Sequence, residues 1–312
     1  MRVIRELNEQ VTFNHPIVTL GTFDGLHLGH QEILRQMVAE GKESGRETVL
    51  LTFHPHPRMV LYPDSHSVRL IDSIEEKLEK LEQSGLDTVI LFPFTQKFSR
   101  LTAVEFVRDV LVRDIGVSKM LVGYDHHFGK NREGDFQQLQ ELGQLYGFEV
   151  NQVQAVQTGD ISVSSTKIRK ALAEGDMLTV ERYLGQPFQL TGEVIHGNKL
   201  GRTIGFPTAN LYIDQTTKIL PETGVYAVKV QRNDHLLNAV MNVGKKPTVQ
   251  QTETISVEVY IFDFDAELYG ELLRVQVFDR LRGEQRFASI DELKSQLAKD
   301  EQNARNVLAA LV

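Results

Sequence analysis

Two histidines, His27 and His30, stand three positions apart in the stretch TLGTFDGLHLGH, residues 19–30. An apolar run precedes the stretch, and the helical pattern HQEILRQMVAEG begins at its last residue. Residues at positions i and i+3 lie on the same side of a helical turn, where two imidazoles can donate hydrogen bonds to phosphoryl oxygens. By itself the pattern leaves three interpretations open: phosphate contacts, metal ligands and ordinary packing.

Three glycines around the histidines favour the phosphate interpretation. Gly21, Gly25 and Gly29 allow the backbone to approach a ligand closely, and the start of the following helix directs unpaired amides at an anion. Ligands of open α/β sheets bind beyond the carboxyl ends of strands, which is where this stretch falls. It matches neither the Walker pattern GxxxxGK(S/T) nor GxGxxG. Imidazole is also a frequent metal ligand, but no HExxH or comparable spacing occurs.

A second candidate for phosphate binding is SSTKIR, residues 164–169. Its hydroxyls, the amides of a predicted helix start, and the cations Lys167 and Arg169 are suited to hold phosphates. The structural alternative is a serine cap followed by bases that face solvent. Together with the histidine pair the stretch favours binding, because both would lie at the ligand-binding edge of one sheet.

The C-terminal half carries a different glycine-rich stretch, GNKLGRTIGFPTANL, residues 197–211. Gly197, Gly201 and Gly205 could let backbone amides wrap a nucleotide phosphate. Thr208 and Asn210 supply oxygen ligands fit for Mg²⁺, which typically uses few protein ligands together with phosphates and water. A turn-rich barrel loop that binds nothing is the alternative interpretation.

Glu258 lies in SVEVYIF, where aliphatic residues alternate with polar ones. The alternation predicts a strand whose Glu258 carboxylate shares the face opposite the aliphatic side chains. Such a glutamate is either solvated or, inside a cleft, able to accept the proton of a substrate hydroxyl that attacks a γ-phosphate.

Composition limits the class of protein. The chain has 312 residues, 41% of them hydrophobic and 24% charged, and contains no cysteine, which excludes disulfides, thiolate catalysis and cysteine zinc sites. A net charge of -8 disfavours a non-specific binder of nucleic acid or membrane. The N-terminus is charged, and no run approaches the ~18 apolar residues that span a bilayer. We expect a cytoplasmic protein with no nucleic-acid, membrane or obligate protein partner.

The order of predicted elements indicates two domains. Short apolar runs alternate with amphipathic ones through the first half, and Thr102 and Glu105 form a predicted capping box. This alternation predicts an α/β domain with a parallel sheet covered by helices on both faces. Beyond a boundary near Gly185 to Pro187 the runs are β-rich, and helical periodicity returns from about Ile290. We therefore predict domains at 1–186 and 187–312, the second a small barrel with a terminal helix.

The motifs together resemble a known family. GTFDGLHLGH, TFHPHP, GYDHHFG and SSTKIR resemble the FMN adenylyltransferase module of bacterial bifunctional riboflavin kinase/FAD synthetases, within the HxGH nucleotidyltransferase superfamily. The second half matches the same family's kinase signature GRxxGFPTAN and continues through GVYA, MNVGKKPT, DFDAELYG and LRGEQRF. The resemblance implies a Rossmann-like HxGH domain followed by a six-stranded Greek-key barrel with a C-terminal helix. It also implies ATP, riboflavin and FMN as substrates and Mg²⁺ as cofactor.

The resemblance assigns roles residue by residue. In the adenylyltransferase, His27 and His30 would be catalytic, and the flavin would contact His56 and Pro57. ATP and its phosphates would contact Gly21, Phe23, Asp24, Gly29, Asp125, Ser165, Thr166 and Arg169. In the kinase, Glu258 would be the catalytic base, Arg282 would lie near flavin and phosphate, Thr208 and Asn210 would hold MgATP, and the glycines at 197, 201 and 205 would bind ATP.

Some positions depart from the common family pattern: His54, His126, His127, Lys167 and Tyr260. They affect the expected flavin and ribose contacts rather than the residues assigned to chemistry. Two rival hypotheses remain. Another HxGH adenylyltransferase, for pantetheine phosphate or nicotinate mononucleotide, would leave the barrel unexplained. A non-catalytic flavin-binding regulatory protein would not need every catalytic position to be filled.

Overall fold

The structure is a computed structural model that describes residues 1–7, 11–63, 69–124, 126–154, 156–158, 161–197, 200–246 and 254–311. The chain divides into two compact units. The first unit comprises Met1–Leu70 and Lys77–Ser164, and the second comprises Ile71–Glu76 and Ser165–Val312. Each unit has its own sheet and core.

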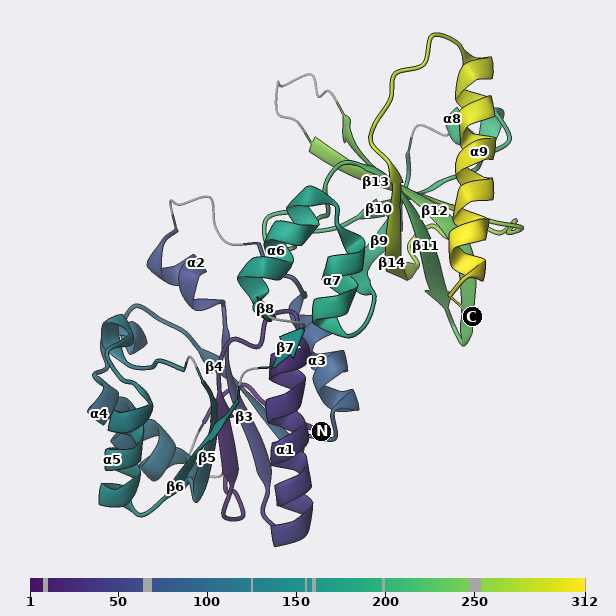
Figure 1. The fold of residues 1–312 in the computed structure, drawn as a ribbon. Coiled ribbons are helices and arrows are strands. Elements are labelled where there is room, and N and C mark those ends of the chain that lie inside the picture. The colour runs from purple at the N-terminus through teal and green to yellow at the C-terminus, as the bar shows by residue number, and fades with distance from the viewer. Residues whose placement is uncertain are drawn as a thin grey trace. The chain divides into compact units, whose positions relative to one another are not determined.

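The first unit contains a six-stranded parallel sheet in the order β1-β4-β3-β2-β5-β6 (Figure 1). Its strands are β1 (Arg2–Ile4), β2 (Ile17–Leu20), β3 (Thr48–His54), β4 (Thr88–Pro93), β5 (Lys119–Gly123) and β6 (Glu149–Val153). A short pair, β7 (Gln157–Thr158) and β8 (Ile161–Ser162), follows. The parallel sheet predicted from the alternating pattern is confirmed.

Helices cover both faces of this sheet, with α1 on one side and α4 and α5 on the other in Figure 1. The helical segments are α1 (Leu28–Ser44), α2 (Pro57–Leu61), α3 (Ile74–Gln83), η1 (Phe98–Arg100), α4 (Ala103–Glu105), η2 (Phe106–Ile115), η3 (Lys130–Arg132) and α5 (Phe136–Tyr146). The predicted capping box is present, since Thr102 and Glu105 each accept a hydrogen bond from the other's backbone N–H.

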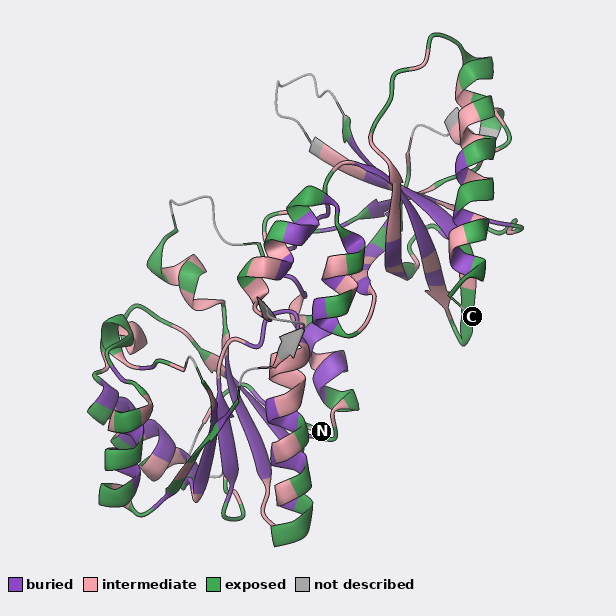
Figure 2. Ribbon diagram, viewed as in Figure 1, coloured by how far each residue is buried: buried purple, intermediate pink, exposed green. Residues whose placement is uncertain are grey.

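Buried aliphatic residues hold the sheet between these layers (Figure 2). All four residues of β2 and the first five of β3 are buried. Strands covered on both faces bury both sets of side chains, so they appear as continuous apolar runs rather than alternating ones. The sheet is therefore a rigid support for the loops at its carboxyl edge.

The strand order places one of these loops at a special point. From β2 the chain moves through β3 to β4 on one side, and then returns to place β5 on the other side of β2. The carboxyl ends of β2 and β5 therefore flank a topological switch point, where open α/β sheets bind ligands. The stretch that contains His27 and His30 follows β2 directly.

The second unit is built on a closed six-stranded antiparallel barrel in the order β10-β13-β12-β11-β14-β9. The strands are β9 (Phe188–Ile195), β10 (Ala209–Tyr212), β11 (Gly224–Arg232), β12 (His235–Lys246), β13 (Thr254–Ile261) and β14 (Leu272–Arg282). The connection from β10 to β11 passes over two intervening strands, which gives the predicted Greek-key arrangement.

Four helices belong to the described part of this unit: α6 (Ser165–Glu174), α7 (Met177–Leu184), α8 (Leu200–Thr203) and α9 (Ile290–Ala309). The terminal helix α9 packs on the barrel through Ala304 and Leu308, as predicted. Helices α6 and α7 group with the barrel by packing. The predicted domain boundary at 186/187 stays a prediction.

A buried ion pair ties the short segment Ile71–Glu76 into the second unit. Lys218 pairs with Glu76, and the two side chains are 3% and 2% exposed. The Lys218 ammonium also donates hydrogen bonds to the backbone oxygens of Ile71, at 2.6 Å, and Gln189, at 2.8 Å. Its three donors thus have three acceptors, which is the condition for burying a lysine at an acceptable free-energy cost.

We expect Glu76→Leu to lower the free energy of unfolding by about 3–5 kcal/mol, because it leaves Lys218 as an uncompensated buried charge. Adding Lys218→Met should recover part of the loss, since no unpaired charge then remains. Urea unfolding followed by circular dichroism measures both effects. Glu32→Leu, which breaks the surface pair with Arg35, is the matched control and should change stability little. A double variant that loses the full sum of the single effects would contradict this account.

Candidate functional site

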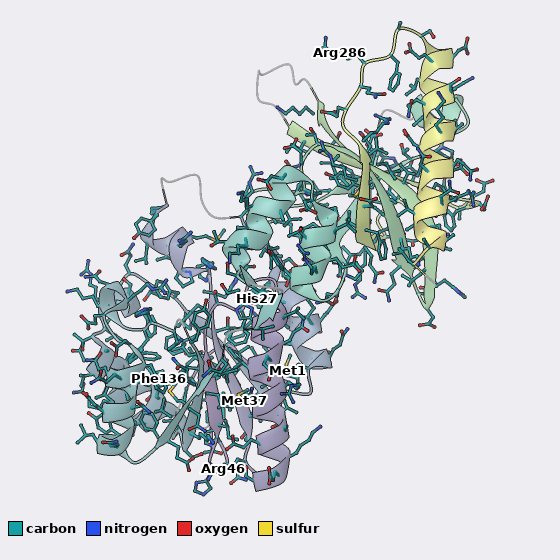
Figure 3. All side chains as sticks on the ribbon, viewed as in Figure 1. Met1, His27, Met37, Arg46, Phe136 and Arg286 are labelled. Carbon is teal, nitrogen blue, oxygen red and sulfur yellow. The ribbon has the colours of Figure 1, made fainter. Side chains whose placement is uncertain are left out.

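His27 occupies the N-cap position of α1. Its Nδ1 accepts a hydrogen bond from the backbone N–H of His30 at 3.4 Å, in place of the serine or aspartate oxygen usually found at an N-cap. Because Nδ1 acts as acceptor, the neutral ring carries its proton on Nε2. The cap therefore leaves the His27 ring with one defined N–H donor. His27 lies at the start of α1 and is labelled in Figure 3.

His30 lies between two other rings. Its imidazole stacks on His27 with centroids 3.6 Å apart and on Phe23 with centroids 4.5 Å apart. Within the described part of the chain, its buried Nδ1 has no hydrogen-bond partner. Burial of the ring, followed by electrostatic effects of His27 and Lys77, holds the pKa of His30 well below its ordinary value of 6.5. The ring is therefore neutral near pH 7.

Lys77 supplies a buried cation to this loop. The side chain is on α3, and its ammonium donates to the backbone oxygen of Thr22 at 2.9 Å. Thr52 donates to the same oxygen at 3.2 Å. Sequence reasoning missed Lys77, although the sequence contains a signal for it. A helical pattern of apolar positions runs from Ile74 to Leu81, and Lys77 occupies the position three residues after Ile74. A lysine at a core-facing position of an amphipathic helix is a candidate for a specific role.

Two predicted glycines make room for the rings rather than for a ligand alone. A Cβ at Gly29 would lie 3.2 Å from the His27 ring, and a Cβ at Gly21 would lie 3.1 Å from the Phe23 ring. The loop between them is sharply bent, since Phe23 and Leu26 both have positive φ angles, of 46° and 40°. Glycine at positions 21 and 29 therefore permits the stacked arrangement of the rings.

The other residues of the first unit that were predicted to contact nucleotide or flavin are Asp24, Asp125, His56 and Pro57. Asp24 is only 1% exposed and interacts within the protein. Asp125 lies outside the described residues. His56 is the N-cap of α2, where its Nδ1 accepts from the N–H of Arg58 at 3.2 Å, and Pro57 is the first residue of that helix. These structural roles leave the proposed flavin contacts of His56 and Pro57 as predictions.

The stretch SSTKIR begins α6, as predicted from its serines and threonine. Ser165 and Arg169 both interact within the protein. Helix α6 groups with the second compact unit, whereas the histidine pair belongs to the first. The expected approach of Ser165, Thr166 and Arg169 to the histidines stays a prediction.

Among the described residues, the other histidines form no metal ligand set. His54 and His127 are exposed, and His126 stacks on Phe128 with ring centroids 5.9 Å apart. Across the ranges that the structure describes, no three His, Cys, Asp or Glu side chains come together closely enough to hold a metal ion. The structure thus gives the metal interpretation of the histidine pair no support within those ranges.

In the second unit, the predicted base lies directly beside a predicted metal ligand. Asn210 on β10 is paired in register with Glu258 on β13, so the two side chains share one face. The hydroxyl of Thr208 donates to the Glu258 carboxylate at 3.4 Å. Val257 and Val259, on either side of Glu258, are buried in the barrel. The alternation predicted from SVEVYIF is confirmed, and the carboxylate is on the outer face.

A cleft opens next to these residues. Its lining comprises Val194, Gly197, Pro207, Thr208, Ala209, Asn210, Val259, Ile261, Phe264, Asp265, Ala266, Glu267, Leu268 and Tyr269. The glycines of the loop are sterically required: a Cβ at Gly197 would lie 2.2 Å from the Asn210 amide, and one at Gly201 would lie 2.2 Å from the oxygen of Phe206. Gly205 has a φ of +90°, which L-residues rarely adopt.

Arg282, near the end of β14, forms a forked ion pair with Asp300 of α9 at 2.7 Å. Asp300 is 1% exposed and lies on the same helix face as Ala304 and Leu308. An aspartate among the apolar positions of a helix indicates a buried ion pair, and sequence reasoning missed this signal. The pair fixes the guanidinium through two parallel hydrogen bonds.

A cavity of about 500 Å³ in the first unit lies at the opposite edge of the sheet from the histidines. Its polar side chains bind one another: Arg2 pairs with Glu47 at 2.7 Å, and Asp87 accepts from the Thr48 hydroxyl at 2.7 Å. None of the residues predicted for chemistry lines it. We interpret this cavity as a recess whose polar side chains bind one another rather than a ligand.

Comparisons with known proteins cover both units. A family model described as FAD synthetase matches residues 10–167, and one described as riboflavin kinase matches residues 184–308. The bifunctional riboflavin kinase/FMN adenylyltransferase of Escherichia coli K12 is 39% identical over 98% of this chain and 97% of its own. The protein of the same name from Bacillus subtilis is 38% identical over 92% and 91%.

A solved structure from Streptococcus pneumoniae, titled a macrolide-efflux protein, is 33% identical, with a TM-score of 0.89 over 98% of this chain and 99% of that one. The similarity therefore extends over both units. In the part of the present chain that the structure describes, no helix combines the length and hydropathy that a membrane crossing requires.

The cation at Lys77 predicts a measurable change in His30. Lys77→Met should raise the pKa of His30 toward its ordinary value, because a positive charge that disfavours the imidazolium is removed. NMR titration of the imidazole ring protons measures the shift directly. Arg35→Met, which removes an exposed cation from α1, is the control and should leave the titration unchanged. An unaltered His30 titration in Lys77→Met would show that Lys77 does not act on the ring.

Proposed function

The chain belongs to the bifunctional riboflavin kinase/FMN adenylyltransferase family, and from that premise we propose which residues perform each of its two reactions. The enzyme converts riboflavin and ATP to FMN and ADP, and then FMN and ATP to FAD and diphosphate. We assign the first reaction to the barrel and the second to the parallel-sheet domain. One observation carries this assignment: the FAD synthetase model covers His27 and His30, and the riboflavin kinase model covers Thr208, Asn210 and Glu258.

In the kinase reaction Glu258 would act as the general base. An alcohol is a poor nucleophile, so the 5′-hydroxyl of riboflavin must lose its proton as its oxygen attacks the γ-phosphorus of ATP. The bond between that phosphorus and the bridging oxygen breaks, and ADP leaves with the electron pair. Thr208 and the loop glycines Gly197, Gly201 and Gly205 would hold the triphosphate in the adjoining cleft. Arg282, held by Asp300, would serve flavin and phosphate contacts.

The donor set beside the cleft suits magnesium. A threonine hydroxyl, an asparagine carbonyl and a carboxylate are hard oxygen donors, and Thr208 and Asn210 both lie next to Glu258. We propose that Thr208 and Asn210 hold Mg²⁺ bound to ATP. The ion would neutralise charge on the phosphate oxygens.

Adenylyl transfer has different requirements. The phosphate of FMN is already anionic near neutral pH, so its oxygen can attack the α-phosphorus of ATP without a strong base, and diphosphate leaves with the electron pair. Catalysis then depends on alignment and on stabilising developing charge. His27, with its proton on Nε2, and the neutral His30 would donate hydrogen bonds to the phosphoryl oxygens.

Other groups would complete the adenylyltransferase site. Ser165, Thr166 and Arg169 at the start of α6 would hold the triphosphate, and Asp125 would help bind nucleotide. His56 and Pro57 would contact the flavin. A different HxGH adenylyltransferase is the weaker hypothesis, because it leaves the riboflavin kinase match unexplained. We further propose a cytoplasmic enzyme that acts on small molecules without a nucleic-acid, membrane or obligate protein partner, in line with its charge of -8.

The direct test incubates the purified chain with riboflavin, ATP and Mg²⁺ and separates the flavins chromatographically over time. FMN should appear first and FAD afterwards. Excess chelator should stop FMN formation, since the triphosphate is then bound without its cation. If neither flavin product forms under oxidising or reducing conditions, the proposed function is wrong.

The two reactions should be separable by single substitutions. His30→Ala should lower FAD formation by about 10²- to 10³-fold while FMN accumulates, because one hydrogen-bond donor to the transition state is lost. Glu258→Ala should lower FMN formation by about 10²- to 10⁴-fold while supplied FMN is still converted to FAD. Each variant thus controls for the folding of the other. Loss of both reactions in either folded variant would refute the assignment of one reaction to each domain.

A further inference from the structure

The register of the barrel places a third polar side chain beside Glu258. On one side Glu258 pairs with Asn210 of β10, and on the other it pairs with Asn242 of β12. Directly opposite residues of antiparallel strands share a face and have Cβ atoms roughly 4.5–5.5 Å apart. Asn242 is therefore as close to the proposed base as the proposed metal ligand is, from the opposite direction.

The same row continues around the barrel. Asn242 pairs with Val225 of β11, and Val225 pairs with Arg282 of β14. Neighbouring strands are roughly 4.8 Å apart, so Arg282 is three strands, or roughly 14 Å, from Glu258. The Arg282 guanidinium is held by Asp300. Asn242 is therefore the polar side chain in this row that separates the base from the arginine.

The side chain of Asn242 is half-buried. Among the residues that the structure describes, its carboxamide has no hydrogen-bond partner. Space beside it is kept by Gly244, where a Cβ would lie 2.9 Å from the Asn242 Nδ2 and 2.8 Å from a Glu284 carboxylate oxygen. An amide can both donate and accept, which suits it to bind a hydroxyl group.

We propose that Asn242 binds a hydroxyl of the substrate's polyhydroxyl chain, next to the hydroxyl that is phosphorylated. The inference rests on the proposed riboflavin kinase function. When the terminal hydroxyl of the substrate lies at Glu258, the next hydroxyls along its chain lie about as far from Glu258 as a directly paired residue does. Asn242 is such a paired residue. Asn242 is then a substrate-binding residue that selects a hydroxylated chain.

The test compares Asn242→Leu and Asn242→Ala with the unchanged full-length protein. The KM for riboflavin should rise about tenfold to a hundredfold, because a hydroxyl that loses its partner is left unpaired in the site. The KM for MgATP should stay within twofold, and conversion of supplied FMN to FAD should be unchanged. Asn238→Leu is the matched control, since Asn238 is exposed on the same face of β12 four residues away.

Lumiflavin distinguishes hydroxyl binding from a structural effect, because it has the flavin ring system without the hydroxyl chain. Its inhibition constant against the kinase reaction should be the same in Asn242→Leu and the unchanged protein. An unchanged riboflavin KM, or equal weakening of riboflavin and lumiflavin, would overturn the role of Asn242. Absence of FMN formation by the unchanged protein would instead refute the proposed kinase function, and this inference with it.

Discussion

The strand register of the barrel is the constraint on which the second site depends. Side chains alternate between the two faces of a strand, so a shift of one residue moves every side chain to the other face. Val257 and Val259 are 2% and 1% exposed, and their burial keeps Glu258 on the outside. A register slip would place the carboxylate in the apolar interior and the two valines on the outer face of the barrel. Apolar packing therefore determines where the acid–base chemistry proposed for Glu258 could occur.

The first site depends on a helix start in a comparable way. Capping of α1 by His27 and hydrogen bonding to a phosphate are compatible roles, because they use different ring nitrogens. The cap fixes the tautomer and the ring orientation, and the stacked His30 and Phe23 limit movement. The structural role of His27 would thus also preorganise the ring for the proposed phosphate contact. Preorganised donors lower a barrier because little reorganisation accompanies the reaction.

Local patterns in the sequence predicted much of this fold, whereas long-range pairings did not follow from them. The alternation of elements, the Thr102 cap and the barrel strand at Glu258 depend on neighbouring residues. Strand order depends on pairings between distant segments, which periodicity does not encode. Strand β1 has three residues and was too short to produce a pattern. The inclusion of Ile71–Glu76 in the second unit depends on Lys218, far away in the chain.

Burial of the His30 ring, with His27 and the cation of Lys77 as further causes, gives the histidine site its electrostatic character. An imidazolium would attract the triphosphate of ATP as strongly before the reaction as during it, and such uniform binding does not raise the rate of the chemical step. A neutral N–H donor gains strength mainly as negative charge develops on the oxygen it contacts. Burial, His27 and Lys77 all disfavour a proton on His30. The packing around His30, together with Lys77 of α3, thus keeps the ring in the neutral state in which, under the proposed role, it would discriminate between ground state and transition state.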